Sequence, residues 1–240
     1  MALRAEALRR PLSIDAIRDG GVYSLTLDPL AQTGLFLEVG RIDDVYVKVP
    51  SQRGLDDYRR YVRLAQSTPV EIRVLEPSER FEALDSTLQR FPDFLELGAV
   101  SRETVHYMAV HRLQYERLRA EAAVHVPVAR FAVLRSGKLF SKLAPVFFQE
   151  PIEGTTLWQM FDFSVSEVTK RWWPFLPAIS AQLERLLDSP LLNHIDWNIQ
   201  NFVFREKDER LFYVDMKPTT FVAKESNEQN LKGIRDYFVG

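Results

Sequence analysis

The segment LLNHIDWNIQNFVF, at residues 191–204, constrains the fold of this chain more than any other, because polar side chains interrupt an otherwise apolar run. The preceding PAISAQLERLLDS has the periodicity of an amphipathic helix, with Pro177 in its first turn. The following FVF and LFYVD flank the polar turn REKDER and read as a β-hairpin that ends in Asp215. The sequence therefore predicts a helix, an irregular polar loop and a hairpin in direct succession.

Composition limits what the rest of the chain can be. With 240 residues and 46% hydrophobic content, it is long enough for one large domain or for two lobes that share a cleft. The formal net charge of -2 disfavours nucleic acid as a partner. The chain contains no cysteine, which excludes disulfides, thiolate zinc sites and a cysteine nucleophile. We find no secretory signal and no segment long enough to span a membrane, so we expect a cytoplasmic protein.

The first half of the chain predicts a sheet. Short runs rich in β-branched and aromatic residues predict three antiparallel strands at 21–29, 34–40 and 43–50, and two more joined around Ser136 and Gly137. Residues 51–100 read as an insertion with two helical segments around a strand-like PVEIRVLE. A longer helix is expected from Ser101, its cap, to about Ala123.

That helix carries a carboxylate in an unusual position. Its residues at spacings of three and four share one face, which is otherwise apolar: Val105, Ala109, Leu113, Glu116 and Ala120. A charged side chain on an apolar face needs a buried partner. Glu116 is therefore the preferred partner for a strand lysine, with Glu121 and Glu71 as alternatives.

The polar loop has residues suited to phosphoryl transfer. His194, Asp196 and Asn201 spell H-x-D-x-x-x-x-N, for which the composition gives a chance expectation of about half a percent. A carboxylate at Asp196 can orient or deprotonate a hydroxyl. Asn201 and Asp215 offer the hard oxygen ligands that Mg²⁺ takes when it is shared with phosphates.

These motifs resemble the protein-kinase-like superfamily, and most closely its aminoglycoside phosphotransferase-like and other bacterial small-molecule kinase branches. HIDWNIQN resembles the catalytic loop, VDMKP the metal-binding segment and VYVKV the strand that carries the phosphate-binding lysine. VFFQEPIEGTTL resembles the hinge and the start of the second lobe. The resemblance covers roughly residues 20–220, in the family's order.

The resemblance implies a two-lobed α+β fold. Residues 1–150 would form an N-lobe with a five-stranded antiparallel sheet and the insertion at about 51–100. Residues 151–240 would form a short, mainly helical C-lobe with the catalytic loop.

It also implies a role for each matching residue. Asp196 would be the catalytic base, with Asn201 and Asp215 as ligands of Mg²⁺. Lys48 would hold the α- and β-phosphates of ATP, on the strand face that it shares with Tyr46 and opposite Val45, Val47 and Val49. His194 would hydrogen-bond backbone near Asp215. The adenine would bind the hinge, which comprises Gln149, Glu150 and Pro151.

Three departures from the family pattern leave alternatives open. No G-x-G-x-x-G joins the first strands, Asn198 stands where relatives carry Lys or His, and Lys217 replaces the glycine after the metal-binding aspartate. Lys217 can return positive charge near the γ-phosphate.

The expected function is ATP- and Mg²⁺-dependent transfer of the γ-phosphate to a hydroxyl of a small molecule or sugar. The alternatives are a compact protein kinase, a nucleotide-transferring enzyme, or a pseudokinase-type module that binds nucleotide or another protein. The sequence leaves open whether the protein binds a protein partner or forms a homo-oligomer.

Overall fold

The computed structural model describes residues 6–7, 11–24, 32–33, 37–51, 53, 55–56, 102–136, 142–161, 170–216 and 224–239. The chain divides into two compact units, of which the first comprises 1–113 and 128–151 and the second 114–127 and 152–240. The last division follows Pro151, one residue beyond the predicted boundary between the lobes. Most of the predicted insertion, from residue 57 to residue 100, lies outside the described residues, as do Ser101 and Lys217.

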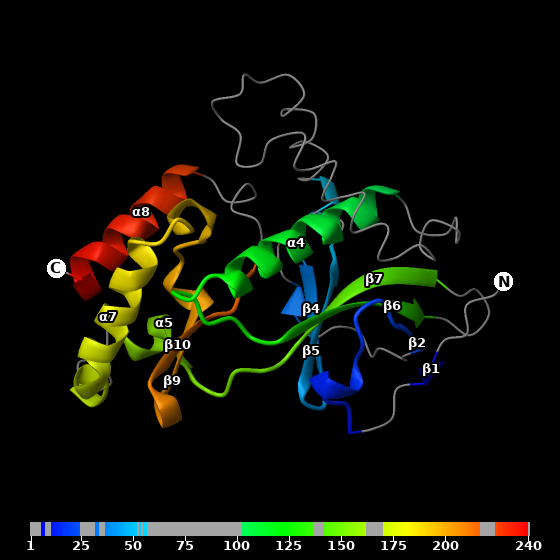
Figure 1. Ribbon diagram of the computed structural model, residues 1–240, viewed down its shortest axis with the longest axis horizontal. Helices are drawn as coiled ribbons and strands as arrows, with labels where there is room; N and C mark the ends of the chain where they lie inside the picture. The colour runs from blue at the N-terminus through cyan, green and yellow to red at the C-terminus, as the bar shows by residue number, and fades with distance from the viewer. Residues whose placement is uncertain are drawn as a thin grey trace, which may run out of the picture. The chain divides into compact units, whose positions relative to one another are not determined.

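The first unit is built on a seven-stranded mixed sheet with the order β1-β2-β6-β7-β5-β4-β3. Its longer strands lie side by side in Figure 1. The strands are β1 (Glu6–Ala7), β2 (Val22–Ser24), β3 (Gln32–Thr33), β4 (Leu37–Ile42), β5 (Val45–Pro50), β6 (Ala129–Ser136) and β7 (Lys142–Gln149). The pairs β3–β4, β4–β5, β5–β7 and β7–β6 are antiparallel. The prediction of α+β structure is confirmed, whereas the prediction of a five-stranded, wholly antiparallel sheet is wrong.

The error concerns the first predicted strand. β2 does not pair with β4; it runs parallel to β6 and also to β1. The turn before β2 fixes this arrangement, because Asp19 accepts a hydrogen bond from the Phe131 amide at 2.8 Å and the Gly20 amide donates to the Phe131 carbonyl at 2.7 Å. Gly20 has a φ of 74°, which a glycine adopts without strain. The turn thus places β2 along β6 through contacts more than 100 residues apart.

β5 follows the predicted alternation. Val45 and Val47 are fully buried in the core of the first unit, while Tyr46 and Lys48 on the opposite face are half-buried. The tight turn before β5 contains Asp43 at a φ of 49°, and the Asp43 carboxylate accepts a hydrogen bond from the Leu12 amide at 2.9 Å. The strand lysine is therefore held at a defined register, opposite Phe147 of β7.

The long helix α4 (Arg102–Ala120) confirms the predicted helix, but its buried face differs from the predicted stripe. Leu113 and Glu116 are half-buried and Ala120 is exposed. Among the positions of α4 whose burial is described, the buried ones are Met108, His111, Arg112, Gln114, Tyr115 and Leu118. Long polar side chains can be buried when their heads find partners, and the Arg112 guanidinium lies 5.3 Å from the centroid of the Phe131 ring. Glu116 is thus not on the most buried face of α4.

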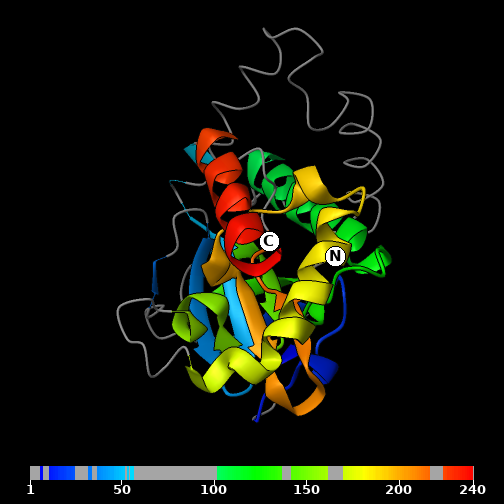
Figure 2. The same cartoon turned by 90° about the vertical axis from the view of Figure 1, so that its left-hand side faces the viewer.

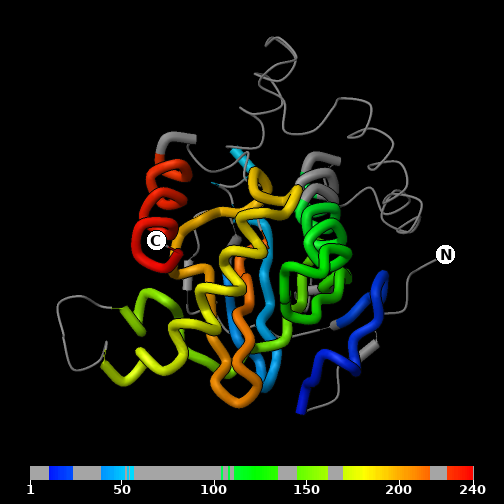
Figure 3. The backbone as a smooth tube through the Cα atoms, turned by 60° about the vertical axis from the view of Figure 1, so that its left-hand side comes forward, coloured from blue at the N-terminus to red at the C-terminus, as the bar shows by residue number. Residues whose placement is uncertain are grey.

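The second unit contains a small sheet and several helices. β8 (Thr155–Thr156), β9 (Phe202–Arg205) and β10 (Arg210–Tyr213) form an antiparallel sheet of order β10-β9-β8. The predicted hairpin is confirmed as β9 and β10, drawn in orange in Figure 3. The described helices of this unit include α5 (Leu157–Met160), η3 (Trp173–Phe175), α7 (Leu176–Leu187), η6 (Glu206–Asp208), α8 (Lys224–Ile234) and the π-helix η8 (Arg235–Val239). Figure 2 shows α7 in yellow and α8 in red.

Local sequence accounts for two boundaries in this unit. α7 begins with a proline in its first turn, as predicted. α5 begins at a reciprocal capping box, in which the Thr156 hydroxyl accepts from the Gln159 amide and the Gln159 side chain accepts from the Thr156 amide. A Cβ at Gly154 would overlap the carbonyl oxygen of Phe204, so only glycine fits beside β9 at this point.

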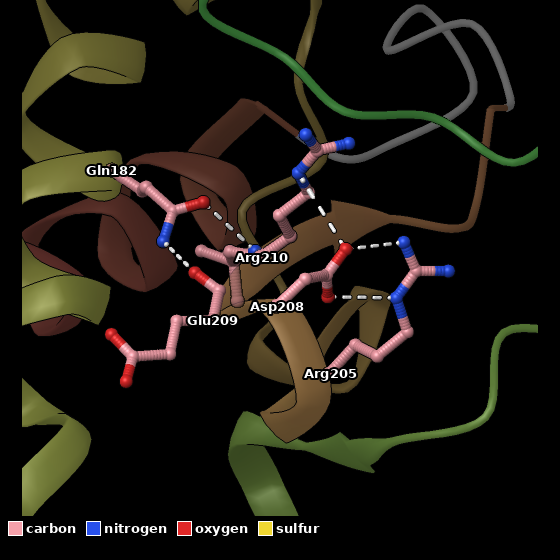
Figure 4. A network of polar contacts seen from close by, with 6 residues as sticks. Gln182, Arg205, Asp208, Glu209 and Arg210 are labelled. Carbon is pink, nitrogen blue, oxygen red and sulfur yellow. Dashed lines mark hydrogen bonds and ion pairs between the residues drawn. The ribbon is translucent and has the colours of Figure 1, made fainter.

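A buried glutamine joins α7 to the turn of the hairpin. The side-chain amide of Gln182 donates to the Glu209 carbonyl at 2.8 Å, and its oxygen accepts from the Leu211 amide at 2.9 Å (Figure 4). Arg205 binds Asp208 through two hydrogen bonds in the same turn. The hydrogen bond from Arg205 is the main reason why the pKa of Asp208 lies below its ordinary value. Gln182 is 9% exposed, so few water molecules can replace its bonds.

Gln182→Leu should lower the free energy of unfolding by about 1–3 kcal/mol, because it leaves the Leu211 amide and the Glu209 carbonyl without their buried partner. Chemical denaturation monitored by tryptophan fluorescence measures this change. The matched control is Gln229→Leu at an exposed position of α8. Equal stability of the two variants would contradict the assigned role of Gln182.

Candidate active site

The polar loop of residues 191–201 is anchored by its apolar side chains. Leu191, Ile195 and Trp197 are each at most 5% exposed. The Trp197 ring stacks on Phe202 at a centroid distance of 5.9 Å, and its indole N–H donates to the Leu192 carbonyl at 3.0 Å. Two short 3-10 turns, η4 (Leu192–His194) and η5 (Ile199–Asn201), flank the extended part of the loop. The buried apolar side chains therefore fix the backbone that carries Asp196.

Asp196 is itself buried, with 3% of its surface exposed. Its amide donates to the hydroxyl of Tyr213 at 3.0 Å. Its carboxylate accepts a hydrogen bond from the Asn198 amide at 3.3 Å, which forms a local Asx-type turn. The backbone of Asp196 is thus held by Tyr213, and its carboxylate by the Asn198 amide.

Asn198, the residue that departs from the family pattern, has a structural explanation. Its side-chain oxygen accepts from the Gln200 amide at 3.0 Å and caps η5. Its carbonyl accepts from the Asn201 amide at 2.8 Å. Asn198 therefore shapes the turn that presents Asn201.

Asn201 links the loop to the hairpin. Its side-chain nitrogen donates to the Asp196 carbonyl at 3.2 Å, and its own carbonyl accepts from the Val214 amide at 2.9 Å. Because the nitrogen of the amide is engaged, its oxygen is the atom suited to a metal ion. Val214 directly precedes Asp215, so one backbone hydrogen bond brings the two predicted metal ligands into the same region.

The hydroxyl of Tyr213 lies under the influence of both predicted carboxylates. Burial raises the pKa of Tyr213 well above its ordinary value, and the negative charges of Asp215 and Asp196 raise this pKa further. Both charges therefore act on one buried hydroxyl. The structure brings together three of the predicted site residues, Asp196, Asn201 and Asp215, all within the second unit.

The donor set suits Mg²⁺ if substrate phosphates complete its coordination. Within the described residues, no three His, Cys, Asp or Glu side chains gather in a way that would hold a metal on protein ligands alone. Asn201 and Asp215 supply hard oxygen atoms, and Mg²⁺ is commonly bound through one or two carboxylates together with water and phosphate oxygens. The residues present thus fit this ion in the form shared with a nucleotide.

The loop is also held by side chains that the sequence did not reveal. Asn227 of α8 accepts from the Trp197 amide at 2.8 Å and donates to the Ile195 carbonyl at 3.0 Å, on either side of Asp196. Gln114 of α4 donates to the His194 carbonyl. The His194 ring lies 3.2 Å from the Arg117 guanidinium of α4, and its hydrogen bond to backbone near Asp215 stays a prediction.

Four of the remaining predicted residues of the nucleotide site lie in the first unit: Lys48, Gln149, Glu150 and Pro151. The Lys48 ammonium lies 5.7 Å from the centroid of the Phe147 ring, and Gln149 is buried at the end of β7. Glu150 accepts from the Val128 amide through its side chain and donates to the Val128 carbonyl through its backbone, both at 2.9 Å.

Pro151 has no N–H, and that of Glu150 is already bonded, so this part of the predicted hinge offers carbonyl groups to an adenine. Glu116 belongs to the second unit, and its pairing with Lys48 stays a prediction. Lys217 lies outside the described residues.

Comparisons with protein families, with curated proteins and with solved structures find no match to this chain. In the described part of the chain, no helix has both the length and the apolar character needed to cross a membrane. The chain is an α+β protein with a mixed sheet in one unit and a polar, hydrogen-bonded loop in the other.

Proposed function

We propose that this protein is an ATP- and Mg²⁺-dependent phosphotransferase of the protein-kinase-like superfamily, which transfers the γ-phosphate to a hydroxyl of a small molecule or sugar. The observation that carries the proposal is that hydrogen bonds join Asn201 to Asp196 and also to Val214, the residue directly before Asp215. Asp196, Asn201 and Asp215 are the residues to which the resemblance gives a base and two metal ligands. Their spacing in the sequence did not require such hydrogen bonds.

The order of the elements supports the same proposal. Five neighbouring strands of the sheet, in the order β6-β7-β5-β4-β3, pair antiparallel with one another. In the sequence, α4 lies between β5 and β6. α7, the polar loop and the hairpin β9–β10 follow. This strand, helix, strand and loop succession is the one that the resemblance predicts, although the parallel strands β1 and β2 are additions to it.

The chemistry follows from the positions of the side chains. The acceptor hydroxyl would be oriented by the Asp196 carboxylate, which takes its proton as the oxygen attacks the γ-phosphorus and the bond to ADP breaks. Asn201 and Asp215 would hold Mg²⁺, and the bound ion would neutralise the negative charge on the phosphate oxygens. Because the protein does little covalent chemistry in such a transfer, the rigidity of the loop is its main contribution.

A second candidate is a pseudokinase-type module whose surface binds another protein. It is favoured by the hinge, where the amide of Glu150 is bonded to Val128 and Pro151 has no N–H to offer an adenine. The two candidates differ in one respect that is simple to measure. Only the phosphotransferase needs nucleotide and metal together.

A thermal-shift assay with ATP, with and without Mg²⁺, tests the proposal. At an ATP concentration about 100 times its dissociation constant, binding should stabilise the folded state by about 2.7 kcal/mol, or roughly 5–10 °C for a chain of this size. The shift should be largest with Mg²⁺ and fall when the metal is chelated. The same midpoint in all conditions would favour the protein-binding module.

A further inference from the structure

Tyr213 stands out among the buried residues because its hydroxyl meets the polar loop. It ends β10 and is 1% exposed. Its amide donates to the His125 carbonyl at 2.8 Å, its Cα pairs with that of Phe202 across the hairpin, and its ring lies 5.4 Å from the Phe202 ring. Backbone and ring are thus both fixed, which leaves little freedom to the hydroxyl.

The Tyr213 hydroxyl joins strand β10 to the polar loop of residues 191–201. It accepts the hydrogen bond from the Asp196 amide, and a phenol also has one proton to donate. The acidic groups acting on it are the carboxylates of Asp215 and Asp196. The hydroxyl binds the backbone of Asp196, so its role is to hold the polar loop against β10.

Other contacts in the region would survive the loss of this hydroxyl. The backbone bond between Asn201 and Val214 does not involve the tyrosine side chain, and the two bonds from Asn227 hold the residues on either side of Asp196. A phenylalanine would occupy nearly the same volume in the core. What would be lost is the hydroxyl that accepts from the buried Asp196 amide.

We propose that Tyr213 is a positioning residue, whose hydroxyl holds the backbone of Asp196, which takes the proton, against the end of β10, two residues before Asp215, which binds the metal. This inference rests on the proposed function. It assigns to the last residue of β10 a part in metal binding and transfer that the resemblance does not give it. Tyr213 itself contacts neither the acceptor nor the phosphate in this account.

The test compares Tyr213→Phe with Tyr237→Phe, a matched change at a position that is 66% exposed in the same unit. Hydrogen–deuterium exchange of the Asp196 amide should become about tenfold faster in Tyr213→Phe, since a lost hydrogen bond of about 1.4 kcal/mol corresponds to a factor of ten. The factor by which Mg²⁺ increases ATP affinity, measured by calorimetry, should also fall about tenfold. ATP affinity without metal should not change.

A conservative replacement gives a further control. Replacement of Tyr213 by 3-fluorotyrosine keeps the hydroxyl and nearly the same volume, so it should restore both the slow exchange and the metal effect. Wild-type exchange and a wild-type metal effect in Tyr213→Phe would overturn the positioning role while the proposed function stands. If ATP binding to the wild-type protein does not depend on metal, the proposed function fails, and the role of Tyr213 in metal binding fails with it.

Discussion

Replacing Asp215 with Asn should abolish the Mg²⁺-dependent part of ATP binding while the fold is kept. The change removes one negative charge and preserves the size of the side chain. Asp215 is the carboxylate that we assign to the metal, and a neutral amide is a much weaker ligand of a hard cation such as Mg²⁺. The stabilisation by ATP with Mg²⁺, about 2.7 kcal/mol at 100 times the dissociation constant, should fall to the level seen without metal.

Thermal shift and isothermal calorimetry with ATP, each with Mg²⁺ and with a chelator, measure this loss. Asp236→Asn is the matched control, because it makes the same chemical change at an exposed position of η8 in the same unit. The midpoint of Asp215→Asn without ligand should lie close to that of the wild type. If Asp215→Asn keeps the full metal-dependent shift, Asp215 is not the metal ligand.

The parts of the fold that the sequence predicted are those with a local signal. β5 was expected because Val45 and Val47 alternate with Tyr46 and Lys48, and burial in the structure follows that alternation. The hairpin β9–β10 was predicted from two apolar runs around a polar turn. Helix α7 was predicted from its apolar periodicity and from the proline in its first turn. In each case the determining residues lie within a few positions of one another.

The parts that sequence reasoning missed depend on contacts between distant residues. β2 is parallel to β6 because the Asp19 carboxylate binds the Phe131 amide, and no local pattern encodes that bond. The buried face of α4 includes Arg112, which hydrophobic periodicity places on the outside. Both errors arise from polar side chains that find partners far along the chain.

In the candidate site, too, the sequence predicted the residues with a local signal and missed those that act through distant contacts. The motif of Asp196, Asn201 and Asp215 was visible in the sequence, since spacing and residue type point to the same chemistry. Tyr213 and Asn227 were not visible, because they contact the loop from 17 and 30 residues away and belong to elements whose sequences suggest only a strand and a polar helix. Sequence therefore identified the groups suited to the reaction, and the structure identified the groups that hold them.

Asp196→Asn should reduce phosphoryl transfer by about 10²- to 10⁴-fold, the usual contribution of a positioned general base. The amide keeps an oxygen that can accept from the Asn198 amide, so the turn of the loop should persist. It cannot take a proton from the acceptor. Transfer is measured with ATP labelled at the γ-phosphate against a panel of hydroxyl acceptors, with water as the reference acceptor.

The binding of ATP separates this variant from Asp215→Asn. Asp196→Asn should keep the metal-dependent thermal shift, because its carboxylate is assigned to the acceptor hydroxyl, whereas Asp215→Asn should lose that shift. If instead Asp196→Asn loses the metal-dependent shift and Asp215→Asn keeps it, Asp196 binds the metal and Asp215 has another role. Wild-type transfer in both variants would exclude phosphoryl transfer at this loop and would leave the buried network around Tyr213 as a purely structural feature.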